Sequence, residues 1–244
     1  QFLQSLRDMF ASSSKSKLNV TVKWDGAPAV FAGPHPETGK FFVAKKSLFR
    51  KKQEPQPYYH TYADIDADTS GELNKKLKVC LDEFSKLGMN EILQGDLMFT
   101  DDTSTMDIDG VKHITFQPNT ILYAVEADSK IGRQISSAKI GVVWHTTYKG
   151  DSIENLKASF GAKIPNKSSK VWQDDATYRD VSGRATFTAK ETVEVTKLLS
   201  AAGKQFQRIN SGSFNEFLRW QDSLGTSASG AGFKTYLNTF TRAG

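Results

Sequence analysis

The chain has 244 residues, of which 38% are hydrophobic, so it can bury the core of one large domain or of one domain with a smaller partner. Its 32 basic and 27 acidic residues give a net charge of +5, which favours a polyanionic partner. It contains no run of about 18 apolar residues and no signal-peptide pattern at its start, which argues against membrane and secreted classes. A single cysteine, Cys80, rules out an internal disulfide, so we expect a cytoplasmic protein.

The first elements that the sequence predicts are a helix and a strand. Apolar residues recur at helical spacing from Phe2 to Phe10. The stretch Leu18–Gly26 then alternates between apolar and polar residues, the pattern of a half-buried strand, with Lys23 on its polar face. A lysine fixed beside Asp25 at a strand end is a candidate nucleophile if it is desolvated or placed near other cations. The same residues also fit a solvated lysine before a turn.

The middle of the chain predicts short strands around one helix. In order, we expect strands at 29–32 and 41–44, an irregular loop at 53–70, a helix at 73–87 capped by Gly88, and a strand at 92–99. Asp96 lies inside the apolar strand 92–99. Because an unpaired carboxylate is costly to bury, we expect a ligand, a cation or Lys23 beside it.

The second half predicts two further strands and then helices. We expect a hairpin turn at Asp109-Gly110, strands at 120–128 and 139–150, and the end of a short helix at 157–161. Without a bulge, the strand 139–150 places Lys139, His145 and Lys149 on one face. From Ala189 to Phe240 the pattern is helical, with a capping box at Ser213-x-x-Glu216. This division predicts domains at 1–188 and 189–244.

Four of these stretches resemble motifs of the covalent nucleotidyltransferases, which comprise ATP-dependent DNA ligases, RNA ligases and mRNA-capping guanylyltransferases. Lys23-Trp24-Asp25-Gly26 resembles motif I, whose lysine attacks the α-phosphate of a nucleoside triphosphate. Gly95-Asp96-Leu97 resembles motif III, the strand 120–128 resembles motif IIIa, and the strand 139–150 resembles motifs IV and V collapsed together. No acid precedes Gly141, where motif IV has its metal-binding carboxylate. Either Glu126 or Asp128 substitutes for it, or the activity is altered or absent.

The resemblance, which covers residues 18 to 150, implies a fold and a set of site residues. The fold would be α+β, with an antiparallel-sheet, ATP-grasp/ligase-like nucleotidyltransferase domain and a helical C-terminal domain closest to phage-type RNA ligases. Lys23 would be the catalytic nucleophile, positioned or deprotonated by Asp25. Asp96 and Glu126 would hold Mg²⁺, with Mn²⁺ as the alternative metal. The residues expected to contact ATP are Trp24, Gly26, Lys45, Lys46, Asp96, Tyr123, Lys139, His145 and Lys149.

The function implied by this resemblance is an ATP-dependent polynucleotide ligase that forms a lysyl-AMP intermediate on Lys23. AMP would pass to the 5′-phosphate of a nucleic acid, RNA rather than DNA, or of a nicked duplex. We expect a monomer without membrane contact, in the host cytoplasm if a phage encodes it. The alternatives are a degenerate module that binds nucleotide or nucleic acid without covalent chemistry, a GTP-dependent capping-type guanylyltransferase, and a structural protein that binds no nucleotide.

Overall fold

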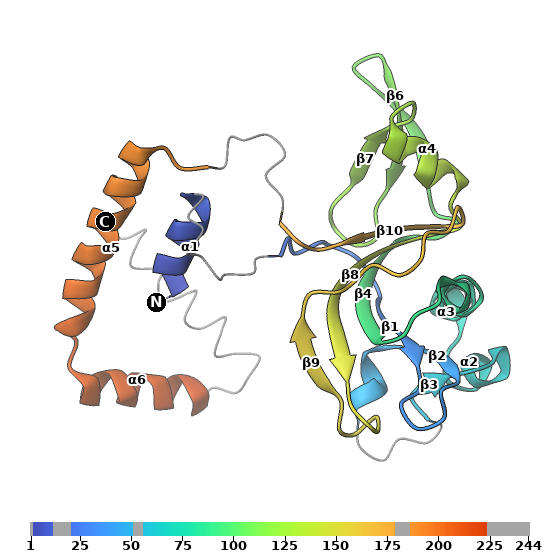
Figure 1. Cartoon of the computed structure of the whole chain (residues 1–244), viewed down its shortest axis with the longest axis horizontal. Coiled ribbons are helices and arrows are strands. Elements are labelled where there is room, and N and C mark those ends of the chain that lie inside the picture. The colour runs from blue at the N-terminus through green and yellow to red at the C-terminus, as the bar shows by residue number, and fades with distance from the viewer. Residues whose placement is uncertain (1, 12–20, 51–55, 179–185, 224–244) are drawn as a thin grey trace. The chain divides into compact units, whose positions relative to one another are not determined.

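The computed structural model describes residues 2–11, 21–50, 56–178 and 186–223. These residues belong to two compact units, one formed by Asn19–Arg179 and one formed by Gln1–Leu18 together with Asp180–Gly244 (Figure 1). The predicted division placed one boundary at 188/189. In the structure the N-terminal helix belongs to the same unit as the C-terminal helices, because it packs on α5 (Ala189–Gln207).

The central unit contains two β-sheets. In its described residues the larger sheet has seven strands in the order β10-β8-β4-β1-β2-β3, with β9 paired to β8 (Figure 1). All pairs are antiparallel except β8 with β10. Its strands are β1 (Ala29–Pro34), β2 (Phe41–Ala44), β3 (Tyr58–Tyr59), β4 (Ile92–Phe99), β8 (Ile140–Lys149), β9 (Lys157–Phe160) and β10 (Val171–Asp175). The smaller sheet consists of β5 (Ser104–Ile108), β6 (Val111–Phe116) and β7 (Tyr123–Glu126).

One face of the larger sheet is covered by helix α3 (Gly71–Phe84), which follows α2 (Tyr62–Asp68) and ends in the 3₁₀ turn η2 (Ser85–Leu87). Leu77, Cys80 and Phe84 recur at helical spacing and are fully buried against the sheet. Trp144 of β8 belongs to the same cluster and meets Phe84 edge to face, with ring centroids 5.2 Å apart. Gly88 ends this segment with a φ of 62°, the left-handed conformation that favours glycine.

The opposite face of the larger sheet carries two apolar clusters with polar side chains between them. Along β4, Ile92 belongs to the cluster beside the 3₁₀ turn η1 (Lys46–Phe49), and Met98 belongs to the cluster beneath the smaller sheet and α4 (Lys130–Ser137). Because alternate residues of a strand share a face, Gln94 and Asp96 lie between these two clusters. The sheet therefore presents a polar strip at this position.

The helical unit is built from both ends of the chain. Helix α1 (Phe2–Phe10) packs on α5 (Ala189–Gln207), and α6 (Ser211–Ser223) follows. The Arg7 guanidinium donates to the Thr196 hydroxyl at 3.2 Å, and the rings of Phe10 and Phe187 lie 5.3 Å apart. Within the described ranges, no helix combines the length and apolar character needed to cross a membrane.

The observed class is α+β with largely antiparallel sheets, as the sequence predicted. The predicted helix at 2–10 and the strands at 29–32, 41–44, 92–99 and 139–150 are present within a few residues. So is the hairpin turn, where Asp109 and Gly110 both have positive φ.

Four predictions of local structure were wrong, and each has a physical cause. The loop predicted at 53–70 contains β3 and α2, because Thr61 and Asp64 form a capping box; residues 51–55 lie outside the described part. The segment 157–161 is strand β9, since it pairs with β8. Helix α6 is capped by Asn210, whose side-chain oxygen accepts from Ser213 N, and not by Ser213. The strand predicted at 18–26 is discussed below, and the predicted helix beyond residue 223 lies outside the described residues.

Candidate functional site

The segment that carries Lys23 is extended but is not a strand. Residues 18–20 lie outside the described part; Thr21 forms an isolated bridge with Thr177, and residues 22–26 pair with no strand. Further along, Ala27 N donates to Leu97 O at 2.9 Å, which joins the segment to β4. The alternating pattern predicts a half-buried strand, but its apolar residues do not share one buried face. Val22 is exposed, and Trp24 packs under the smaller sheet.

Asp25 is fixed by the loop that precedes β7. Its carboxylate accepts four hydrogen bonds, from Asn119 Nδ2 (2.8 Å), Thr120 N (2.7 Å), Thr120 Oγ1 (2.7 Å) and Ile121 N (2.8 Å). These donors, with the Thr120 hydroxyl first among them, hold the pKa of Asp25 far below its usual value of 3.8. A carboxylate held in this way is a weak base. Asp25 therefore positions the segment, and the alternative that it deprotonates Lys23 loses support.

Aromatic rings pack the same segment against the smaller sheet. The ring of Tyr123 stacks on Trp24, with ring centroids 5.6 Å apart, and on Phe116, with ring centroids 5.4 Å apart. The Tyr123 hydroxyl accepts from Asp25 N at 2.9 Å. The ring of Tyr123 and its hydroxyl are thus both engaged within the protein. Tyr123, expected to contact the nucleotide, instead holds the lysine segment in place.

Asp96 lies directly beneath the lysine segment. A Cβ added to Gly26 would meet Asp96 Cβ at 2.5 Å and the carbonyl oxygen of Leu97 at 2.8 Å, so the approach requires glycine at position 26. Burial raises the pKa of Asp96 above its usual value of 3.8, and the negative charge of Asp25 adds to this effect. Lys23 and His145 act in the opposite direction by favouring the ionised form. The electrostatic field of Lys23 therefore reaches Asp96.

His145 joins this site through a β-bulge. Between β4 and β8, Gln94 pairs with Thr146 and Gly95 pairs with Trp144, so His145 is an extra residue on β8. Its Nε2 lies 3.9 Å from Asp96 Oδ1, and its Nδ1 lies 2.7 Å from the Thr146 hydroxyl. The bulge also breaks the side-chain alternation of β8. The common face for Lys139, His145 and Lys149 was predicted for a strand without a bulge, and that condition is not met.

Lys23 itself is exposed and, among the described residues, forms no ion pair. Four predicted site residues thus come together around it: Asp25, Gly26, Asp96 and His145. The arrangement combines an available amine, an anchored carboxylate and a half-buried carboxylate of raised pKa. It is the set of groups that a lysine nucleophile needs for positioning and for losing a proton.

The other predicted cations lie elsewhere. Lys45 pairs with Asp68 at 2.8 Å, Lys139 with Glu83 of α3 at 3.3 Å, and Lys149 with Glu91 at 2.6 Å. Because Glu83 belongs to α3, its ion pair places the Lys139 ammonium on the helix-covered side of the sheet, away from Asp96. Lys46 is exposed on η1, where the neighbouring Ser47 hydroxyl is buried and has no hydrogen-bond partner among the described residues.

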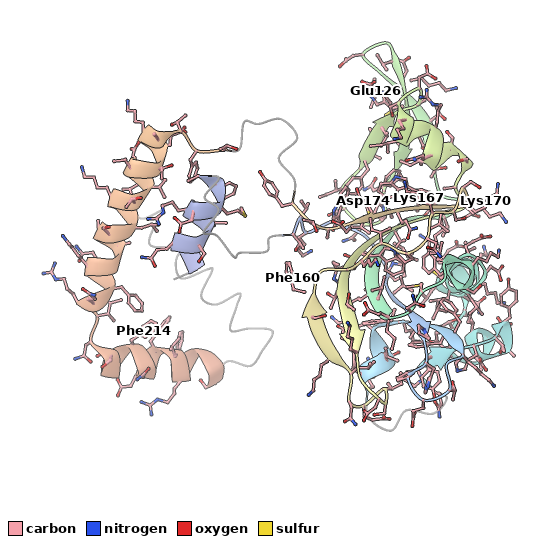
Figure 2. The ribbon with its side chains drawn as sticks, in the orientation of Figure 1. Glu126, Phe160, Lys167, Lys170, Asp174 and Phe214 are labelled. Carbon is pink, nitrogen blue, oxygen red and sulfur yellow. The ribbon has the colours of Figure 1, made fainter. Side chains whose placement is uncertain are left out.

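Glu126, the second predicted metal ligand, does not meet Asp96. It lies at the end of β7 remote from Tyr123, about 10 Å along the strand, and it is exposed while Tyr123 and Val125 face the core (Figure 2). In the ranges that the structure describes, no three His, Cys, Asp or Glu side chains are grouped as a metal site. Since the Asp25 carboxylate already accepts four hydrogen bonds within the protein, Asp96, whose pKa the charge of Lys23 affects, is the better candidate for a metal ligand.

Comparison with known proteins gives a family. A family model described as a family of unknown function (DUF6267) matches residues 1–244. The chain belongs to this family. No curated protein and no solved structure matches the chain. Membership in DUF6267 therefore assigns no activity, and the function has to be argued from the site.

Sequence reasoning missed the residues that anchor Asp25. Asn119 and Thr120 lie in a short polar loop, Gln117–Thr120, between two apolar strands. The signal was available, because asparagine and threonine before a strand commonly hydrogen-bond to nearby chain segments. Nothing in the sequence paired that loop with Asp25, which lies 94 residues away from Asn119.

We expect Asp96→Asn to raise the free energy of unfolding at about pH 7. The folded protein holds the proton of Asp96 more tightly than the unfolded chain does, so wild-type stability falls as pH rises through the raised pKa. Asparagine removes that ionisation. Urea unfolding followed by circular dichroism should show the gain at pH 7 and its disappearance below about pH 4.

The matched control is Glu154→Gln, a neutralisation of an exposed carboxylate in the same unit, which should change stability by no more than about 0.5 kcal/mol. A loss of stability in Asp96→Asn at pH 7 would mean that the charge of Asp96 is structural and contradict its placement in a site.

Proposed function

We propose that this protein is a covalent nucleotidyltransferase of the polynucleotide-ligase type, with Lys23 as the nucleophile. The observation that carries the proposal is an exposed Lys23, without an ion pair among the described residues, on a segment that Asp25 fixes and that lies above the half-buried Asp96 and its neighbour His145. A solvated lysine before a turn would require neither the four-donor anchor nor the close approach of Gly26 to Asp96. The resemblance of Lys23-Trp24-Asp25-Gly26 to motif I supports the same assignment.

The reaction would proceed in two transfers. Lys23 Nζ loses a proton and attacks the α-phosphorus of the nucleoside triphosphate, so that an N–P bond forms while the P–O bond to pyrophosphate breaks. An oxygen of a nucleic-acid 5′-phosphate then attacks the same phosphorus, the N–P bond breaks, and Lys23 recovers a proton. Asp96 is better suited than Asp25 to take the first proton, because burial raises its pKa whereas hydrogen bonds depress that of Asp25.

The residues fit a metal that arrives with the nucleotide and not one held by the protein alone. Mg²⁺ is commonly bound by one or two carboxylates together with substrate phosphates, and Asp96 offers such a carboxylate beside Lys23. When bound, the ion would neutralise charge on the triphosphate.

The test is covalent labelling. Wild-type protein is incubated with Mg²⁺ and either α-labelled ATP or α-labelled GTP, then resolved by denaturing electrophoresis. We expect acid-labile label on the protein, as a phosphoramidate requires, and the labelled nucleotide separates a ligase from a capping-type enzyme. Absence of label with both nucleotides, on folded protein free of bound nucleotide, would contradict the proposal.

A second candidate is a non-covalent binding module with the same fold. It is favoured by the ion pairs of Lys45, Lys139 and Lys149, because these three lysines were expected to bind phosphates and instead contact carboxylates. This candidate predicts nucleotide or nucleic-acid binding that survives replacement of Lys23, with no covalent adduct.

A further inference from the structure

A strongly basic surface lies outside the Lys23 site. The segment 163–170 reads Lys-Ile-Pro-Asn-Lys-Ser-Ser-Lys, with three exposed lysines, Lys163, Lys167 and Lys170, and no acid. Figure 2 shows Lys167 and Lys170 near the start of β10, with Asp174 further along that strand. No ion pair to any of the three is formed by the described residues.

Backbone hydrogen bonds bring two more lysines to this surface. Asn166 N donates to Leu87 O at 3.1 Å, which places the segment beside Lys86, and Lys139 N donates to Lys170 O at 2.8 Å. Lys86 and Lys139 both lie 3.3 Å from the carboxylate of Glu83. Five positive charges thus share one negative charge, and Glu83 is buried while the lysines around it are exposed. These five lysines and Glu83 together carry a net charge of +4.

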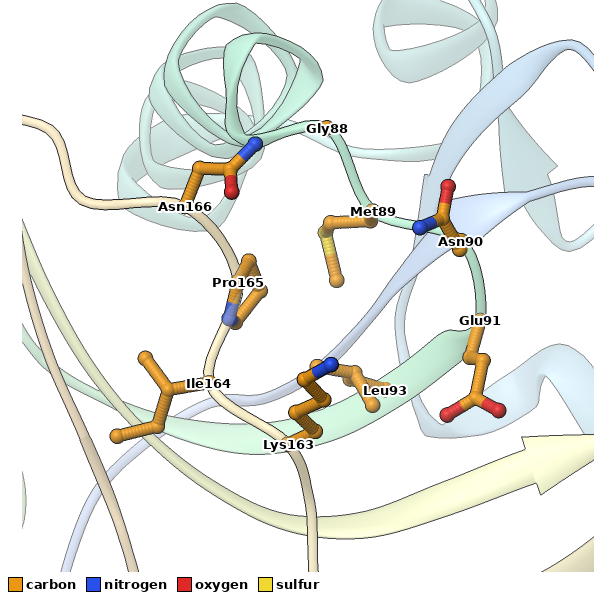
Figure 3. Close-up of a pocket in the computed structure, with 9 residues that line it drawn as sticks. All are labelled: Gly88, Met89, Asn90, Glu91, Leu93, Lys163, Ile164, Pro165 and Asn166. Carbon is orange, nitrogen blue, oxygen red and sulfur yellow. The ribbon is translucent and has the colours of Figure 1, made fainter.

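Two hollows flank the segment and add polar groups. On one side Lys163 and Asn166 line a pocket of about 260 Å³ beside Gly88 and Glu91 (Figure 3). On the other side a pocket of about 370 Å³ is lined by Lys167, the hydroxyl-bearing Ser137, Ser168 and Ser169, and Trp172. Lysine, serine and asparagine are the side chains that commonly contact phosphate oxygens of nucleic acids.

We propose that this surface, formed by Lys86, Lys139 and the lysines of segment 163–170, binds the phosphate backbone of a nucleic acid. The span from Lys163 to Lys170 is at most ~25 Å, which limits the contacts of this segment to a few consecutive phosphates. The surface lies at the Val171 end of β10, about 13 Å along that strand from Asp175, which pairs with Trp144 beside His145. The role of this surface as the acceptor site of a nucleotidyl transfer rests on the proposed function. Its binding of nucleic acid does not.

The experiment measures binding without any nucleotide triphosphate. A fluorescein-labelled single-stranded RNA oligonucleotide is titrated with the full chain, and anisotropy is followed between about 50 and 200 mM salt. We expect the triple variant Lys163→Gln, Lys167→Gln, Lys170→Gln to bind at least ~10-fold more weakly. The slope of log K against log salt should become shallower by about 2, since each phosphate contact contributes about 0.7 on a single strand.

The control is a triple variant with the same loss of charge at exposed lysines elsewhere in the central unit: Lys40→Gln, Lys112→Gln and Lys157→Gln. It should retain most of the affinity, as should the replacement of Lys163, Lys167 and Lys170 by arginine. Equal losses in both glutamine triples, or wild-type protein that binds anionic lipid vesicles and no RNA, would overturn the proposal. Wild-type protein that binds RNA but takes up no covalent label would contradict the proposed function and leave this surface intact, whereas label without RNA binding would do the reverse, so the two failures are distinguishable.

Discussion

Lys23→Ala is expected to abolish covalent nucleotide attachment, lowering the yield of labelled protein by on the order of 10⁴-fold or more, the scale seen when other enzymes lose a covalent nucleophile. The expectation follows from the site: Asp25 and Asp96 have no amine to position or deprotonate once Lys23 is gone, and the carboxylates cannot form the N–P bond. The readout is acid-labile label from α-labelled ATP or GTP on denatured protein.

Two further variants make this result specific to Lys23. Lys23→Arg keeps the positive charge but presents a guanidinium that stays protonated, so it should also remain unlabelled. Lys157→Ala removes an exposed lysine of β9 and should be labelled as wild type is. Full labelling of Lys23→Ala would place the adduct on another residue and remove Lys23 from the mechanism.

Trp144→Ala is expected to destabilise the central unit by about 3–5 kcal/mol, the usual cost of deleting a fully buried aromatic side chain. Trp144 is fully buried, meets Phe84 of α3, and donates from Nε1 to Gln173 Oε1 at 3.1 Å. Its loss would open a cavity between the sheet and the helix and leave the Gln173 oxygen without that donor. The free energy of unfolding in urea, followed by far-ultraviolet circular dichroism, measures the effect.

Phe160→Ala is the matched control, because Phe160 is an aromatic residue of the same unit that is 60% exposed on β9 (Figure 2). It should cost no more than about 0.5 kcal/mol. If both alanine variants lost the same small amount, the packing of α3 on β8 would be looser than the contacts indicate.

The elements that sequence patterns predicted well are those with strong local signals. The helix α3 has an apolar stripe, the segment it begins ends at a glycine, and β4 has apolar residues on both sides of Gln94-Gly95-Asp96. The errors arose where a long-range partner decides the structure. Segment 157–161 has no distinctive pattern and is a strand because β8 lies beside it.

The site residues also divide into those that local sequence patterns predicted and those that depend on long-range partners. Lys23, Asp25, Gly26, Asp96 and His145 were chosen by motif and are together in the structure. The cations were not predictable in the same manner, because an exposed lysine pairs with whichever carboxylate the fold brings near. Glu83 reaches Lys139 from α3 and Glu91 reaches Lys149 from the loop before β4, and no sequence spacing encodes either pair. The extra residue at His145 likewise depends on the register with β4, which a single strand does not reveal.

The bridge between Thr21 and Thr177 has a consequence for how the two ends of the chain find each other. Arg7 and Thr196 are 189 residues apart in sequence, so their contact closes a very long loop in an unfolded chain. Once the central unit is folded, the loop left to close counts only the 14 residues from Arg7 to Thr21 and the 19 from Thr177 to Thr196. Since loop closure costs about 0.6 kcal/mol per doubling of length, this shortening lowers the entropic cost of joining α1 to α5 by ~1.5 kcal/mol. Folding of the central unit therefore raises the effective concentration of α1 near α5.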